Sequence, residues 1–229
     1  MPTRKITRSP VKVTGTVPDG QKFESFLEEE FFTLLRFDHK IERFEEQPIT
    51  IEWKAENGDY RKYTPDALIT YKQEKGSQDQ PRPLLCEVKP DEQDKNNKLT
   101  RRHTPPRKED EKENELKWKA ARLYASQHGW LFKVFRESDI RTPYLGNARF
   151  LLRYLEHEPP SQFRERLLKS LEDRALTLKE WVSEIAPTKE EQARIFPECY
   201  WLIATRTVHV DLNSPLTLYS TISLASENE

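Results

Sequence analysis

Two short motifs in the sequence carry the residue types that phosphodiester hydrolysis needs. Pro65-Asp66 comes first, and Glu87-Val88-Lys89 follows it one predicted strand later. Aspartate and glutamate oxygens hold hard divalent cations such as Mg²⁺, which usually keep several waters. A lysine beside the cation can orient or deprotonate the attacking water, or stabilise the developing charge. The pattern therefore favours metal-dependent hydrolysis, with Mg²⁺ as the cofactor and Mn²⁺ as a substitute for it.

Alternation along the second motif predicts that Glu87 and Lys89 project from one face of a strand. Alternate side chains share a face, so Cys86 and Val88 should point the other way. A buried lysine beside a carboxylate is costly unless it is paired. Asp66 starts the adjacent predicted strand, after a proline that fits the edge of an element. The alternative is an ordinary solvated strand face, because loose matches to this motif are common in charged sequences.

A further acidic group is expected from an amphipathic helix over residues 23–37. Its apolar residues recur at three-to-four spacing, at Phe23, Phe26, Leu27, Phe31, Leu34 and Leu35. On a helical wheel Glu24 and Glu28 lie one turn apart at the edge of this stripe, where a ligand for a sheet-borne metal should be. Glu29 points toward solvent, and Glu30 falls closer to the stripe. All of these acids could instead be surface charges near a helix N-terminus, and spacing does not separate Glu24 from Glu28.

The elements around these motifs predict a mixed α/β sheet. We expect strands over residues 47–53, 60–63, 67–71, 84–89 and 130–135, with Asn57-Gly58 as a hairpin turn. A helix is expected over residues 116–128, ended by Gly129. A helix, several antiparallel strands, and then a helix crossing to another strand fit a mixed sheet.

A second, smaller domain is expected after a boundary near residues 157–160. We predict helices over 162–171, 178–185 and 190–195, then strands over 201–210 and 216–224. Three helices and a terminal hairpin are the parts of a winged helix. The predicted organisation is a flexible basic arm (1–20), a catalytic domain (21–156) and a winged-helix-like domain (157–229).

Composition sets limits on the class of protein. The 229 residues include 5 Trp, 8 Tyr and 11 Phe, which are enough to fill a core. The net charge of −1 gives no bulk signature of nucleic-acid binding, so local patches would have to contact DNA. Cys86 and Cys199 make neither a disulfide framework nor a metal cluster. Without an apolar leader or a bilayer-length apolar window, we expect a soluble, intracellular protein with no membrane partner.

Taken together, these motifs resemble the TnsA family, the endonuclease subunit of heteromeric Tns-type transposases. The resemblance is carried by Ser25-Phe26-Leu27-Glu28, by residues 37–48, by Tyr63-Thr64-Pro65-Asp66, by Glu87-Val88-Lys89-Pro90 and by the helix–strand unit over 118–135. Their combined order is more specific than any one of them. It spans nearly the whole predicted first domain.

The resemblance implies a fold, a function and partners. The fold would be a PD-(D/E)xK restriction-endonuclease-like core followed by a winged-helix-like domain. Such a protein cuts the 5′ ends of a transposon in the bacterial cytoplasm, while a TnsB-like transposase cuts and joins the 3′ ends. The second domain would contact a TnsC-like AAA+ ATPase regulator. Excision by double-strand breaks would give cut-and-paste transposition.

The resemblance also assigns site residues. The family's helix acid falls on Glu28, its aspartate on Asp66 and its lysine on Lys89. Glu87 occupies a ligand position where some members carry Gln, and the carbonyl of Val88 is the implied backbone ligand. The implied catalytic set is Glu28, Asp66, Glu87 and Lys89, with the metal held by the three acids and Val88.

A basic segment after the second motif is the expected DNA contact. It contains Lys95, Lys98, Arg101, Arg102, His103, Arg107 and Lys108. Phosphate contacts from such a segment would be salt-dependent and largely indifferent to sequence. The alternative is a solvated charged loop. The acid-rich second domain lacks a basic recognition helix, which favours protein contact over reading of DNA sequence there.

Two other functions remain in competition. A standalone PD-(D/E)xK nuclease of restriction or repair type would cut DNA without a partner. A catalytically silent transposase scaffold would have no reason to keep Glu28, Asp66, Glu87 and Lys89 together.

Overall fold

The chain divides into two units in the computed structural model, Met1–Ile140 and Arg141–Glu229. The structure describes residues 15–16, 22–23, 26–73, 76–77, 79–91 and 108–225. Most of the expected arm over 1–20 lies outside these residues. The boundary expected near residues 157–160 falls inside the second unit, because the preceding helix packs against a later one in that unit.

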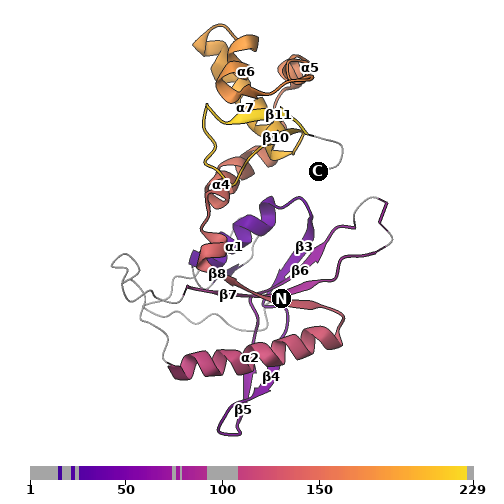
Figure 1. Ribbon diagram of the computed structural model, residues 1–229, viewed down its shortest axis with the longest axis vertical. Helices are drawn as coiled ribbons and strands as arrows, with labels where there is room; N and C mark the ends of the chain where they lie inside the picture. The colour runs from indigo at the N-terminus through magenta and orange to yellow at the C-terminus, as the bar shows by residue number, and fades with distance from the viewer. Residues whose placement is uncertain are drawn as a thin grey trace. The chain divides into compact units, whose positions relative to one another are not determined.

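The first unit is built on a mixed sheet. Its elements are β1 (Gly15–Thr16), β2 (Lys22–Phe23), α1 (Phe26–Phe37), β3 (Ile41–Glu46), β4 (Ile51–Lys54), β5 (Tyr60–Tyr63), β6 (Ala67–Tyr71), β7 (Leu84–Lys89), α2 (Lys108–Gln127), β8 (Leu131–Arg136) and α3 (Glu137–Ile140). The main sheet has the order β3-β6-β7-β8, antiparallel except for the parallel pair β7–β8. The expected mixed α/β fold is confirmed (Figure 1).

The strand predictions succeeded for β6 and β7, which have apolar and buried residues, and failed for the polar edge strand β3. The spans of β6 and β7 were predicted as they occur, and the hairpin of β4 and β5 turns at Gly58, whose φ is +88°. The hairpin forms a sheet of its own. The edge strand β3 was missed, since it is largely polar and mostly exposed. Helix α2 begins at Lys108, earlier than predicted. The prediction missed its first turns because they are charged and carry no apolar periodicity.

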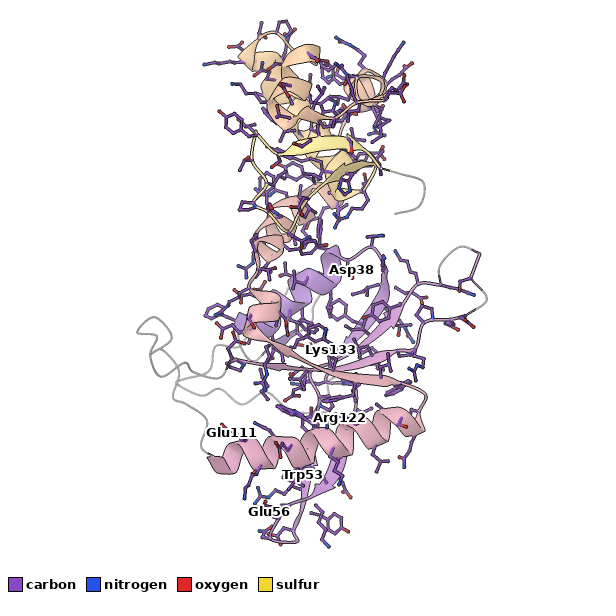
Figure 2. All side chains as sticks on the ribbon, viewed as in Figure 1. Asp38, Trp53, Glu56, Glu111, Arg122 and Lys133 are labelled. Atoms are coloured by element: carbon purple, nitrogen blue, oxygen red, sulfur yellow. The ribbon has the colours of Figure 1, made fainter. Side chains whose placement is uncertain are left out.

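Helices cover both faces of the main sheet in the first unit (Figure 1). Helix α1 buries Phe31, whose ring lies 4.8 Å from that of Phe135 on β8. On the other face, Trp53 of the hairpin and Ala121 of α2 share an apolar cluster with Leu85 of β7. Figure 2 shows Trp53 beside α2. Phe26, expected in the buried stripe, is 59% exposed, since the stripe that packs inward runs through Leu27, Phe31, Phe32 and Leu35.

The second unit combines helices with a three-stranded sheet. Its elements are α4 (Pro143–Leu155), η2 (Ser161–Phe163), α5 (Arg164–Lys169), β9 (Leu176–Thr177), α6 (Leu178–Ile185), α7 (Lys189–Ala204), β10 (Val208–Val210) and β11 (Thr221–Leu224). The sheet is antiparallel, in the order β10-β11-β9. Capping boxes begin α6 at Thr177 and α7 at Thr188. The parts expected of a winged helix are present, and the identification itself stays a prediction.

One predicted strand of this unit is wrong at its start. Residues 201–204 continue α7, and only Val208–Val210 are extended. Pro197 interrupts the helical pattern in the sequence, because proline lacks an N–H and usually ends a helix. The helix continues because Cys199, Leu202 and Ile203 beyond the proline are buried in the core. Their burial offsets the lost hydrogen bond.

None of the helices in the described ranges is long and apolar enough to cross a membrane.

A buried asparagine joins α4 to the loop between β10 and β11. The amide nitrogen of Asn147 donates to the carbonyls of Leu212 and Ser214, both at 2.8 Å. Its oxygen accepts from the backbone N–H of Leu216 at 2.9 Å. Three bonds from one side chain that is 6% exposed hold the loop against α4.

We expect Asn147→Ala to lower the free energy of unfolding by about 2–4 kcal/mol, because it leaves three backbone groups without their buried partner. Chemical denaturation followed by circular dichroism measures the change. Asn213→Ala, in the exposed part of the same loop, is the matched control and should cost less than about 1 kcal/mol. Equal stabilities of the two variants would contradict the role given to Asn147.

Candidate active site

Asp66 lies at the junction of the two motifs. It immediately precedes β6, and its backbone N–H donates to the carbonyl of Cys86 at 2.9 Å. Its carboxylate Oδ2 accepts the backbone N–H of Val88 at 2.7 Å. The side chain therefore takes the place of a strand partner just beyond the Ala67–Cys86 pair of the β6–β7 ladder. The two motifs are held together by the sheet.

Glu87 and Lys89 share a face of β7, as the alternation predicts. The Nζ of Lys89 lies 2.5 Å from Oε1 of Glu87. Glu87 is only 4% exposed, and Lys89 is partly buried. The other carboxylate oxygen of Glu87, Oε2, accepts the hydroxyl of Tyr63 at 2.6 Å. An ordinary solvated strand face would not bury this glutamate, so that alternative is wrong.

The charges of the site act strongly on one another. Removal of the Asp66 carboxylate from water, together with the charges of Glu87 and Glu28, raises its pKa well above the ordinary value. Burial alone would lower the pKa of Lys89, but Glu87, Asp66 and Glu28 together raise it. The site is thus a group of acids held around one ammonium ion.

Glu28 of α1 belongs to this group by its electrostatic effect. Its charge is among the causes that raise the pKa of both Asp66 and Lys89. Glu28 is half-buried at the start of α1, while Glu24 lies outside the described residues. Glu29, expected to face solvent, is half-buried, and its carboxylate accepts the hydroxyl of the buried Thr33 at 3.1 Å.

The expected DNA-binding segment cannot be placed in the site. Lys95, Lys98, Arg101, Arg102, His103 and Arg107 lie outside the described residues. Lys108 is the first residue of α2, and its side chain is likewise outside the described part. Their role in DNA binding stays a prediction.

The donor set of the site fits a hard divalent cation that keeps water ligands. Among the described residues, no group of three or more His, Cys, Asp and Glu side chains is arranged to hold a metal by itself. Asp66, Glu87 and the Val88 carbonyl offer two carboxylates and one backbone oxygen. Mg²⁺ is usually bound through one or two carboxylates, with waters completing its shell. Each carboxylate oxygen has about two lone-pair sites, so the bonds from Val88, Tyr63 and Lys89 leave capacity for a cation.

Sequence reasoning missed Tyr63 as part of the site. From the sequence, Tyr63 is expected only as a residue of a hairpin strand and as part of the Tyr63-Thr64-Pro65-Asp66 motif. Burial and the charge of Glu87 raise the pKa of Tyr63, so its neutral hydroxyl is the donor in their hydrogen bond. The register of the β4–β5 hairpin would have indicated its position, because Tyr63 pairs with Ile51 and so shares the inward face of the hairpin. The available signal was therefore the pairing of Tyr63 with Ile51 on β4, a strand whose residues alternate between buried and exposed.

We expect Asp66→Asn to raise the free energy of unfolding of the metal-free protein by roughly 1 kcal/mol at pH 7, since the amide keeps the Val88 bond and removes a repelled charge. The folded-state pKa of Asp66 is raised. The gain should therefore be absent at pH values below the unfolded pKa of about 3.9 and should appear as the pH rises through it.

Urea denaturation at several pH values tests this expectation, with the exposed Asp59→Asn as the control. A wild type that is more stable than Asp66→Asn at pH 7 without added metal would show that the carboxylates do not repel one another.

The first unit matches a known family over its central part. Residues 38–137 match the family described as TnsA-like endonuclease N terminal. The match runs from the residue after α1 to the first residue of α3, and it includes Asp66, Glu87 and Lys89 but not Glu28. A comparison with curated proteins gives no match. The mixed sheet and this match fit an endonuclease-like fold. The resemblance inferred from the sequence is confirmed over residues 38–137, the part of the chain that matches the TnsA-like endonuclease N-terminal family.

Proposed function

We propose that this chain is a metal-dependent DNA endonuclease that hydrolyses phosphodiester bonds at the 5′ ends of a transposon. It would act with a TnsB-like transposase and a TnsC-like ATPase in cut-and-paste transposition. The observation that carries the proposal is the Asp66–Val88 bond beside the Glu87–Lys89 pair, inside a TnsA-like endonuclease domain. This arrangement concentrates acids around one lysine at the joined ends of two strands.

The residues of the site divide the chemistry among them. Asp66, Glu87 and the Val88 carbonyl would hold Mg²⁺ or Mn²⁺, and Glu28 would reach the cation through one of its water ligands. When bound, such a cation supplies Lewis acidity toward a phosphate oxygen. Lys89 is favoured as the ammonium ion by the surrounding carboxylates. In that form it donates hydrogen bonds to phosphate oxygens or to the attacking water and stabilises the developing negative charge.

We expect Asp66→Ala and Lys89→Ala each to reduce 5′-strand cleavage by at least about 10³-fold, since each removes a group that acts on the reacting phosphate. The assay follows each strand of a transposon-end duplex in Mg²⁺ or Mn²⁺, with and without the neighbouring transposase. Lys72→Ala, an exposed lysine just after β6, is the control and should cut like wild type.

The outcomes of this assay separate the competing functions. Metal-dependent 5′ nicking that needs the transposase and is lost in both variants supports the proposal. Efficient specific cutting by the isolated protein would instead identify a standalone nuclease. No cutting by wild type under any of these conditions would identify a silent scaffold.

The second unit is proposed to be a winged-helix-like domain that binds partner proteins. The order α5, β9, α6, α7, β10 and β11 within this unit, with β9 paired to β11, supports the architecture. The first turn of α7 carries Glu190 and Glu191 beside a single basic residue, Lys189, so this turn is net acidic. A helix that enters the major groove is usually rich in cations, so this charge favours a protein partner.

We expect a chain that ends at Ile140 to lose co-purification with the TnsC-like regulator while it keeps Mn²⁺ binding at the site. The division of the chain at Ile140 gives the reason, since the site residues lie in the first unit. Pull-down and Mn²⁺ titration measure the two properties, after circular dichroism has established that the shortened chain is folded. Undiminished capture of the regulator by the folded first unit would refute this division of roles.

A further inference from the structure

The hydroxyl of Tyr63 is a polar group placed in an otherwise apolar cluster. Tyr63 ends β5 and is 8% exposed. Its side chain packs with Ile51 and Trp53 of β4, Leu85 of β7 and Ala121 of α2. Burial of a tyrosine hydroxyl is unfavourable unless it finds a hydrogen-bond partner. Here the partner is a carboxylate oxygen of Glu87 at 2.6 Å.

This hydrogen bond crosses between two sheets. Tyr63 belongs to the β4–β5 hairpin, whereas Glu87 belongs to the main sheet. Because the ring is held by the hairpin, by β7 and by α2, the hydroxyl has a fixed position. The orientation of the Glu87 carboxylate is therefore set by a residue of the buried apolar cluster.

The two oxygens of Glu87 are held by different groups. Lys89 lies against Oε1 at 2.5 Å, and Tyr63 donates to Oε2 at 2.6 Å. Two donors on opposite oxygens fix the plane of a carboxylate, which a single ion pair does not. Without the tyrosine hydroxyl, Oε2 would be buried without this donor, and Glu87 could turn toward Lys89 or Asp66.

We propose that Tyr63 is the positioning residue for Glu87, and that its hydroxyl holds this carboxylate in the one orientation that binds the divalent cation. The inference rests on the proposed function, because it gives Glu87 a ligand role. Tyr63 would act through Glu87 and not by contact with the substrate or the cation. Partners that orient a metal ligand commonly contribute about 10–100-fold to metal affinity or activity.

The test compares Tyr63→Phe with Tyr60→Phe in the full-length protein. Phenylalanine keeps the ring in the cluster and removes only the hydroxyl, and Tyr60 is 75% exposed on the same strand. Mn²⁺ binding is measured by electron paramagnetic resonance, and 5′-strand cleavage is measured over a range of Mg²⁺ concentrations. We expect Tyr63→Phe to bind Mn²⁺ about 10–100-fold more weakly, with a matching rise in the Mg²⁺ needed for half-maximal cleavage. The rate at saturating Mg²⁺ should change less, and Tyr60→Phe should behave like wild type.

A second pair of variants separates positioning from simple stabilisation. In a Glu87→Ala background the hydroxyl has no carboxylate to hold, so adding Tyr63→Phe should weaken Mn²⁺ binding no further. Equal further losses in both backgrounds would assign Tyr63 to the core alone and overturn the proposal. Wild-type Mn²⁺ affinity in Tyr63→Phe would overturn it as well. A wild type that neither binds Mn²⁺ nor cuts would instead overturn the proposed function, and this inference with it.

Discussion

The bond from the Val88 N–H to the Asp66 carboxylate joins the two halves of the site, and the rest of the first unit is arranged around it. It extends the β6–β7 ladder past the Ala67–Cys86 pair with a side chain in place of a backbone carbonyl. A register shift of one residue would turn Glu87 and Lys89 to the opposite face of the sheet. The register of β6 on β7 therefore decides whether the acids and the lysine meet.

Each layer of the first unit contributes a different group to this meeting point. The sheet provides Asp66, Glu87 and Lys89, while α1 provides the charge of Glu28. The hairpin provides the hydroxyl of Tyr63, held by its packing against α2. Like charges crowded together away from water weaken a folded protein unless a counter-charge is present. Lys89 supplies only part of that counter-charge, and the surplus of acids is typical of sites built for cations.

The parts of the fold that were predicted best from the sequence are the strands whose residues are mostly apolar and buried. Strand β6 alternates between more and less buried residues, β7 is mostly buried, and Glu87 and Lys89 lie on one face of β7 as side-chain alternation predicts. The sequence could not show that β3 is a strand, since its exposed edge has little apolar pattern. Nor could it show that α7 passes through Pro197, because the compensating burial of Leu202 and Ile203 is a tertiary effect.

The site was likewise predictable only in part. The shared face of Glu87 and Lys89 follows from local alternation, and the pairing of Asp66 with Val88 needs only adjacent strands. The choice of Glu28 over Glu24 came from family resemblance, since both lie at the edge of one helical stripe. Tyr63 reaches Glu87 across two separate sheets. That contact depends on how the hairpin packs, which no local pattern encodes.

The parallel pairing of β7 with β8 has a consequence for how the protein is made. Antiparallel β6 and β7 are near neighbours in the chain, so they can pair soon after Lys89 leaves the ribosome. The other edge of β7 must wait for β8, which follows only after the long crossover that contains α2. During that interval an apolar strand has unpaired N–H and C=O groups, which are a template for pairing with another chain. The strand that carries the acid and the lysine is thus also a segment exposed to misassembly during synthesis.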